Sequence, residues 1–219
     1  MTDLTTRYLG LELPHPVVAS AGPLTRDADG VRALADGGAA AIVLHSLFEE
    51  QIRQESARDI LLEERNEEFY AESLSFFPEA GRKHEPISHR YLSLLERAAA
   101  AVDVPVIASL NGSDLGGWTS FARRMQDAGA AALELNIYLV TGDVKSRARE
   151  VEDRHVEIVR AVTSEVDIPV AVKLSPTCPP SARWRCVWTR RAPTVSCSST
   201  GGPSPTSTSS RSRCRADSD

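Results

Sequence analysis

Five short apolar runs, each ending in small or polar residues, constrain the fold of this chain more than any other feature. They are PVVASAG (16–22), AAIVLHS (40–46), PVIASLNG (105–112), AALELN (131–136) and PVAVKLSP (169–176). Continuous apolar runs of this length are typical of strands buried on both faces, as in a parallel sheet. We therefore predict a strand in each run.

Amphipathic helical patterns lie between most of these runs. They are DADGVRALADGGAAA (27–41), DLGGWTSFARRMQDAGAAA (114–132) and VEDRHVEIVRAVTSEVDIP (151–169). Apolar residues recur three and four positions apart, and the first two patterns stop at glycines suited to left-handed helix caps. Alternating strands and helices predict an α/β fold, which we expect to be an incomplete (β/α)8 TIM barrel of about five βα strands over residues 1–176.

Residues 47–90 break this alternation with a long, charged and partly helical segment. Two interpretations stay open. The insertion is either a lid or partner surface over the carboxyl end of a strand, or a solvated helical excursion.

The composition changes after residue 176. Residues 177–219 hold ten Ser, six Thr and five Pro but no Leu, Ile, Phe, Tyr or Met, so they cannot bury enough apolar surface to offset their ordering entropy. We expect a disordered tail. Trp184, Trp188 and all four cysteines also lie there, in no disulfide or zinc-binding pattern, and no metal site is expected.

A change of reading frame explains the tail better than a disordered linker does. With CGN codons for Arg and TCN codons for Ser, the frame starting at the third base of the Arg183 codon permits LALRLDAAGADGLVLFN. That sequence is similar to the chain's own FARRMQDAGAAALELN (121–136). We expect a frameshift between Pro176 and Arg183, which early stop codons in the alternative frame of the coding DNA would contradict.

The charge is unevenly distributed along the chain. Residues 1–176 carry a net charge of −10 and residues 177–219 carry +5. An acidic body argues against nucleic acid or an anionic membrane as a partner. No signal peptide and no apolar run near ~18 residues is present, so we expect a cytoplasmic protein.

The strand ends predict a ligand site, because function in parallel α/β folds gathers at the carboxyl ends of strands. The residues at these ends are Ser20, Ala21, Gly22, His45, Ser46, Asn111, Gly112, Asn136, Lys173 and Ser175. Asn111 and Asn136 suit the edge of a heterocycle, or else cap the following loops. His45 is either an acid/base or ligand, or a structural residue. Gly112 with Gly116-Gly117 flanks a loop that could approach a phosphate, in too loose a spacing to form a motif.

Lys173 is the most informative of these residues, because a lysine that ends a buried strand is costly unless its charge meets a partner. It could hold an anionic or electron-rich ring, or form a Schiff base if it is desolvated. The structural alternative is an ion pair with Glu134 on the neighbouring strand.

Several of these segments together resemble the dihydroorotate dehydrogenase family, and most closely its bacterial dihydroorotate dehydrogenase-like branch. The resemblance lies in PVVASAGPLT (16–25), SLFEEQI (46–52), ASLNGSDLGGWTSFARRMQDAGAAALELN (108–136) and PVAVKLSP (169–176). It implies a barrel that holds FMN over the carboxyl ends of its strands. It also implies oxidation of a dihydropyrimidine in pyrimidine biosynthesis, by hydride transfer to the flavin while a base removes a proton. For the intact family member we expect a homo-oligomer.

The resemblance also implies roles for individual residues. Ala19, Ser20, Gly22 and Ser46 would contact FMN, Asn111 and Asn136 would hydrogen-bond flavin or substrate, and Lys173 would stabilise negative charge on the reduced ring.

Two positions depart from the family pattern. The position of the usual base falls on Leu139, and Tyr138, the nearby candidate, would need a pKa well below its ordinary value of about 10. His45 stands where the family has Lys. Both changes favour a reduced ring other than dihydroorotate as the substrate.

We expect this chain to fold poorly and not to retain FMN, because only five βα strands precede the tail and the inner apolar face would stay uncovered. Two other functions stay open. They are a Schiff-base lyase that uses Lys173, and a non-catalytic interaction protein built on the sheet and the 47–90 helices.

Overall fold

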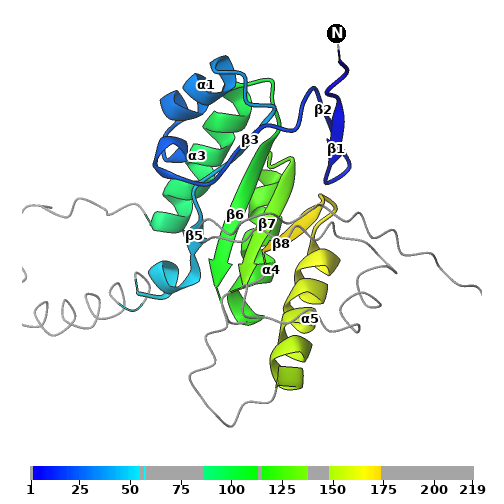
Figure 1. The fold of residues 1–219 in the computed structure, drawn as a ribbon. Coiled ribbons are helices and arrows are strands. Elements are labelled where there is room, and N and C mark those ends of the chain that lie inside the picture. Colours follow the sequence, from blue (N-terminus) through cyan, green and yellow to red (C-terminus); the bar gives the residue numbers. More distant parts are fainter. Residues whose placement is uncertain (1, 55–56, 58–85, 113–114, 138–147, 174–219) are drawn as a thin grey trace, which may run out of the picture.

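The computed structural model describes residues 2–54, 57, 86–112, 115–137 and 148–173 (Figure 1). Its helices are the 3-10 turn η1 (Pro23–Thr25), α1 (Ala28–Asp36), α3 (Ile87–Ala101), α4 (Leu115–Asp127) and α5 (Ala148–Glu165). Its strands are β1 (Thr6–Tyr8), β2 (Leu11–Leu13), β3 (Val18–Ala19), β4 (Ala41–Val43), β5 (Leu47–Phe48), β6 (Val106–Gly112), β7 (Ala132–Ile137) and β8 (Val170–Lys173).

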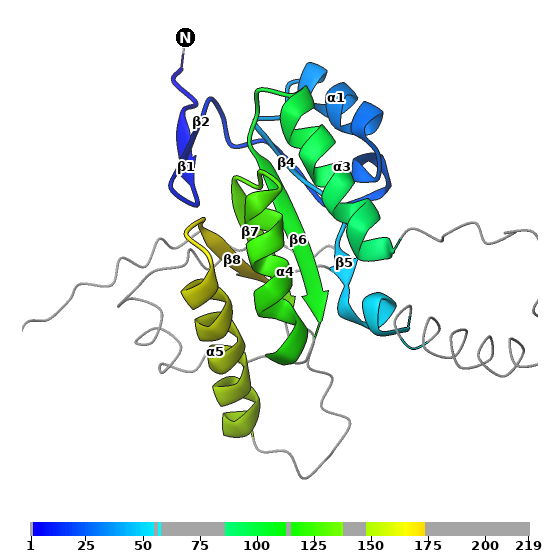
Figure 2. The same ribbon diagram turned by 180° about the vertical axis from the view of Figure 1, so that it is seen from behind.

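Strands β3 to β8 form one parallel sheet in the order β3-β4-β6-β7-β8. Strand β5 continues the path of β4 along β6, after a break at residues 44–46. A helix lies between most consecutive strands, and right-handed crossovers between sequential parallel strands put such helices on one side. Helix α4 lies behind β6 and β7 in Figure 1 and in front of them in Figure 2, so it covers that face.

Side-chain alternation divides the buried residues into two clusters. The larger cluster joins the helices to one face of the sheet, through residues such as Leu95, Leu110 and Leu133. The smaller cluster lies on the opposite face near the amino ends of the strands, where Ile107 and Ala171 meet the first strand pair. The period of two along each strand produces this division.

An antiparallel hairpin of β1 and β2 covers the second face near the amino ends of the strands. Its two-residue turn places Leu9 and Gly10 at φ values of 53° and 78°, the left-handed conformation of a type I′ turn. Leu9 and Leu13 are buried in the second cluster. The apolar part of this face near the amino ends of the strands is therefore covered, and the expected poor folding of the chain stays a prediction.

The expected fold class, an incomplete (β/α)8 TIM barrel of about five strands, is corrected by this topology. The described sheet is open and has six strands, and its outer strands β3 and β8 each pair with a single described neighbour. A barrel requires a continuous ladder between its first and last strands, and the described residues contain none. Strand β4 takes up only residues 41–43 of the run AAIVLHS, β5 follows in the predicted insertion, and the hairpin was not predicted.

Each of the five predicted strand ranges contains an observed strand, and the three helical patterns correspond to α1, α4 and α5. Gly38 and Gly129 adopt the left-handed conformation after α1 and α4, with φ values of 87° and 93°. Within the predicted insertion, residues 47–48 form β5 and residues 87–90 begin α3. Residues 58–85 and the tail at 177–219, with its expected disorder and frameshift, lie outside the described residues.

Candidate functional site

The sheet face that carries the hairpin becomes polar toward the carboxyl ends of its strands. Along β6, the apolar Ile107 is followed on this face by Ser109 and Asn111. The pairing register aligns Asn111 with Asn136 and Asn136 with Lys173. A row of polar residues therefore crosses three adjacent strands at the edge where parallel α/β proteins bind ligands.

Ser109 is the centre of the hydrogen bonds on this face. Its hydroxyl lies 2.9 Å from the Ser46 hydroxyl and accepts a hydrogen bond of 2.9 Å from the Asn136 amide. It donates to Glu134 Oε1 at 3.4 Å. Ser109 is fully buried, and Glu134 and Asn136 are each 4% exposed. Such a network fixes the orientation of its members because unpaired buried polar groups are costly.

Lys173 and Glu134 form an ion pair, with 2.6 Å between Nζ and Oε1. Their side chains are 22% and 6% exposed. The structural alternative considered for Lys173 is therefore present. The pair brings a cation to the polar row together with a carboxylate that compensates its charge.

Tyr91 of α3 fills a gap in the sheet beside Ser109. Strand β4 pairs with β6 at residues 106 and 107, and β5 pairs with it at residues 110 and 111. Between them, the Tyr91 hydroxyl accepts a hydrogen bond of 3.0 Å from the Ser109 N–H and donates one of 3.2 Å to the Ser109 carbonyl. Burial raises the pKa of Tyr91 well above its ordinary value, so the hydroxyl stays protonated and keeps both bonds.

We expect Tyr91→Phe to lower the free energy of unfolding by about 1–3 kcal/mol, because it leaves the buried Ser109 N–H and carbonyl without this partner. Urea denaturation followed by circular dichroism measures the change. A loss below about 0.5 kcal/mol, the size of an ordinary surface effect, would contradict the assigned role of the hydroxyl.

His45 points away from the polar row, although the adjacent Ser46 accepts a hydrogen bond of 3.4 Å from Asn136 of that row. Its Nδ1 lies 3.2 Å from the Thr25 carbonyl oxygen and therefore carries the proton, since a carbonyl only accepts. The ring makes an edge contact with Tyr91, with 5.2 Å between centroids. Burial, and secondarily the charge of Arg26, lower the pKa of His45 below its ordinary value of 6.5, although the Thr25 contact opposes this.

The other predicted site residues lie in several places. Ala19 ends β3 and is half-buried, and Ser20 after it is exposed. Gly22 is half-buried, and its carbonyl accepts a hydrogen bond from the Thr25 hydroxyl. No described hydrogen bond joins these three residues to the polar row. Gly112 ends β6, and Gly116-Gly117 lies in the first turn of α4. Tyr138, Leu139 and Ser175 lie outside the described residues.

Sequence reasoning missed two members of the site, Ser109 and Tyr91. The alternation along β6 was a usable signal for Ser109, because it shares a face with the predicted Asn111. No sequence signal identified Tyr91, since its role depends on the gap between β4 and β5.

Among the described residues, no three or more His, Cys, Asp or Glu side chains gather where they could hold a metal ion. None of the described helices combines the length and apolar character needed to span a membrane.

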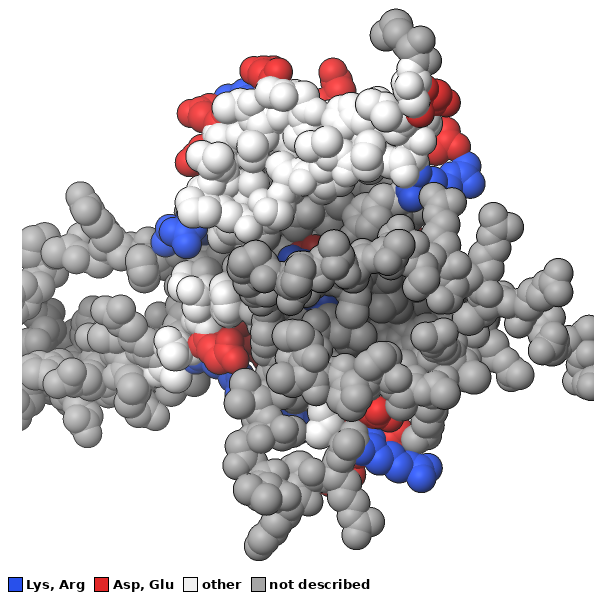
Figure 3. Space-filling view, in the orientation of Figure 1, with Lys and Arg blue, Asp and Glu red and all other residues white. Residues whose placement is uncertain are grey.

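Charged side chains on one face are visible in Figure 3. The described Lys and Arg side chains form small separate groups on this face, with Asp and Glu groups among them. The described part of this face therefore has no continuous basic stripe of the kind that binds nucleic acid.

Comparison with known proteins found two curated relatives of the same name, while no protein-family model matches the chain. The chain is 31% identical over 179 residues to "Dihydroorotate dehydrogenase B (NAD(+)), catalytic subunit" of Thermoplasma acidophilum, covering 80% of this chain and 55% of that protein. The Thermoplasma volcanium protein of that name is 28% identical over 181 residues, with the same coverage.

A solved structure shares the fold. It is a Pseudomonas aeruginosa protein provisionally named a dihydrodipicolinate synthetase, with a TM-score of 0.51 and 15% identity, covering 83% of this chain and 55% of that one. At this identity the likeness concerns the fold alone.

The fold and the site together define a parallel α/β protein with a polar site at the carboxyl ends of its strands. By sequence, the chain is similar over 80% of its length to dihydroorotate dehydrogenase B catalytic subunits, which supports the resemblance drawn from its motifs. The chain spans about half the length of the curated relatives it matches, 55% in each case.

Proposed function

We propose that this protein is an FMN-dependent oxidoreductase acting on the CH–CH bond of a dihydropyrimidine-type ring, with impaired activity in the present chain. The observation that carries the proposal is the polar row of Asn136 and Lys173 at the carboxyl edge of the sheet, with Ser46 beside it. The names of the curated relatives support the reaction class.

The polar row offers suitable groups to the pyrimidine edge of a flavin. The Asn136 amide group donates to Ser109 and Ser46, while its oxygen Oδ1 makes no hydrogen bond to another described residue. Asn136 is 4% exposed, and a buried amide oxygen without a partner fits a ligand N–H donor. The Ser46 hydroxyl, which is half-buried beside it, is a second group able to donate or accept.

FMN, when bound, would supply the hydride acceptor. The ammonium of Lys173 would stabilise the negative charge that develops on the ring, and Glu134 would hold that ammonium at the edge of the sheet. Asn111 is a further hydrogen-bonding candidate because it aligns with Asn136. Three further points stay predictions. They are the flavin contacts of Ala19, Ser20 and Gly22, the role of Tyr138 as the base, and a cytoplasmic homo-oligomer.

The ion pair argues against the Schiff-base alternative for Lys173. Nζ of Lys173 lies 2.6 Å from Glu134 Oε1 and is therefore engaged in an ion pair. Attack on a carbonyl requires the neutral amine. The shared fold of the Pseudomonas aeruginosa protein is compatible with many chemistries and does not favour a lyase.

The experiment compares the 219-residue chain with a protein translated in the frame that continues beyond Pro176 in the coding DNA. Each is purified, incubated with FMN, gel-filtered and examined by its absorption spectrum. We expect the 219-residue chain to lose flavin, and the frame-restored protein to keep it and to bleach on addition of dihydroorotate or 5,6-dihydrouracil. The variant Asn136→Leu should weaken flavin retention in the frame-restored protein, while Arg123→Gln on the exposed surface of α4 should not.

Two results would contradict these expectations separately. A frame-restored protein without flavin would refute the proposed function. A yellow 219-residue chain after gel filtration would refute only the expected impairment of this chain.

A further inference from the structure

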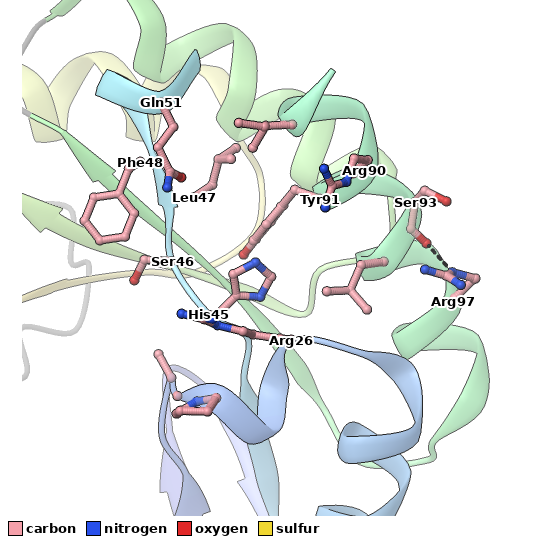
Figure 4. A pocket seen from close by; sticks show the side chains of 15 residues that line it. Arg26, His45, Ser46, Leu47, Phe48, Gln51, Arg90, Tyr91, Ser93 and Arg97 are labelled. Carbon is pink, nitrogen blue, oxygen red and sulfur yellow. Dashed lines mark hydrogen bonds between the residues drawn. The ribbon is translucent and has the colours of Figure 1, made fainter. Parts of the chain in front are cut away.

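A second site lies beside the polar row, on the side of the chain toward which His45 points. A cavity of about 730 Å³ is bounded by the segment after β3, the segment from His45 to Gln51 and one side of α3 (Figure 4). Its volume is within the range of about 300–1,000 Å³ typical of small-molecule sites.

The charge that lines this cavity is positive. Three arginines contribute to its wall, Arg26 from the segment after η1 and Arg90 and Arg97 from α3, and none of its described lining residues is an Asp or Glu. Several arginines elsewhere are paired with carboxylates, such as Arg7 with Glu12 and Arg32 with Asp29. Within the described residues, neither Arg26 nor Arg90 has an ion-pair partner.

The spacing on α3 explains how two of these arginines reach the same cavity. Arg90 and Arg97 are seven residues apart, which is two helical turns, so they share a face of the helix. Arg97 also donates from Nε to the Ser93 carbonyl at 3.2 Å. Figure 4 shows Arg26 beside His45 and the two α3 arginines farther along the same wall.

The amino end of α3 opens on the cavity as well. Ile87 and Arg90 in its first turn line the wall, and Pro86 at the N-cap supplies no side-chain cap. The helix has 15 residues, so its amino end adds partial positive charge to that of the arginines. His45 leaves Nε2 as an acceptor, because Nδ1 donates to Thr25.

We propose that this cavity binds a phosphate group, free or carried on a small organic molecule, held mainly by Arg26 and Arg90. Guanidinium groups bind phosphate oxygens through strong charge-assisted hydrogen bonds, and a phosphate dianion can be bound by more than one guanidinium at once. The polar row does not compete for this anion, because Glu134 already compensates the charge of Lys173. The cavity shares Gly22 and Ser46 with the predicted flavin contacts, but the arginines that would hold the anion are not among those contacts.

Isothermal titration calorimetry on the 219-residue chain tests the site with ribose 5-phosphate, inorganic phosphate and ribose. We expect both phosphates to bind and ribose not to bind. Tighter binding of ribose 5-phosphate than of phosphate would assign the site to an organic phosphate, and equal binding to the free anion. Arg26→Gln and Arg90→Gln should each weaken binding at least about tenfold, the loss of one charge-assisted hydrogen bond.

The matched control is Arg123→Gln, since Arg123 is an exposed arginine of α4 outside the cavity. It should leave the affinity unchanged.

A second readout is the pKa of His45 by NMR, which an anion beside Arg26 should raise. The other titratable or charged groups that line the cavity are Arg26, Arg90, Arg97 and Tyr91. Any of three results would overturn the proposal. Neither phosphate binds, Arg123→Gln weakens binding as much as the two cavity variants do, or the pKa of His45 is unchanged when the site is saturated with ligand.

Discussion

Lys173→Met is expected to lower the free energy of unfolding by about 3 kcal/mol, because it leaves the Glu134 carboxylate buried without its cation. Glu134 has a side chain only 6% exposed, and its remaining described partner is the Ser109 hydroxyl at 3.4 Å. Methionine keeps most of the volume of the lysine stem, so the loss reports on charge rather than on packing. Urea denaturation at neutral pH measures it.

The double variant Glu134→Leu with Lys173→Met should recover most of this stability, because no uncompensated charge is then buried. The matched control is Arg32→Met. Arg32 pairs with Asp29 at a similar 2.7 Å, but these side chains are 54% and 91% exposed, so its loss should cost less than about 1 kcal/mol. Equal effects of the two single variants would show that burial does not strengthen the Lys173 pair.

Leu95→Ala is expected to lower the free energy of unfolding by about 2–5 kcal/mol, through lost burial and the cavity left behind. Leu95 is fully buried in the larger cluster, where α3 packs on the sheet. Since domains are stable by only about 5–15 kcal/mol, this one change could remove a large share of the total. Thermal and urea denaturation both measure it.

Leu24→Ala provides the matched control for this substitution. Leu24 in η1 is 66% exposed, so the same change should alter stability by no more than about 0.5 kcal/mol. A small effect at Leu95 would mean that α3 is not an integral part of the core.

The positions of the strands could be predicted because their signal is local. The run PVIASLNG contains all of β6, and AALELN contains most of β7. Alternation within those runs also separates the two faces, so that Ser109 and Asn111 of β6 fall on the same one. A strand buried on both faces must be apolar over most of its length, and that requirement is visible without any tertiary information.

The contacts that complete the sheet could not be predicted in the same way. Tyr91 reaches Ser109 only because the path from β4 to β5 breaks at residues 44–46. The same break turns the His45 ring toward the arginine-lined cavity. Ser46 also lines that cavity, while its hydroxyl contacts Ser109 and Asn136. The hairpin was missed because each of its strands has three residues, too few to show a periodic pattern.

The sequence by itself therefore determined the runs that contain β3, β4, β6, β7 and β8, the patterns of α1, α4 and α5, and the ion pair of Lys173 with Glu134 as one of several alternatives for Lys173. The tertiary structure decided that a hairpin covers part of one sheet face, which residues meet at the carboxyl edge of the sheet, and where the uncompensated arginines gather. The physical reason is the distance along the chain between the residues that interact. Strand and helix patterns arise from neighbouring residues along the chain, whereas charge compensation and buried hydrogen bonds depend on residues brought together from distant segments.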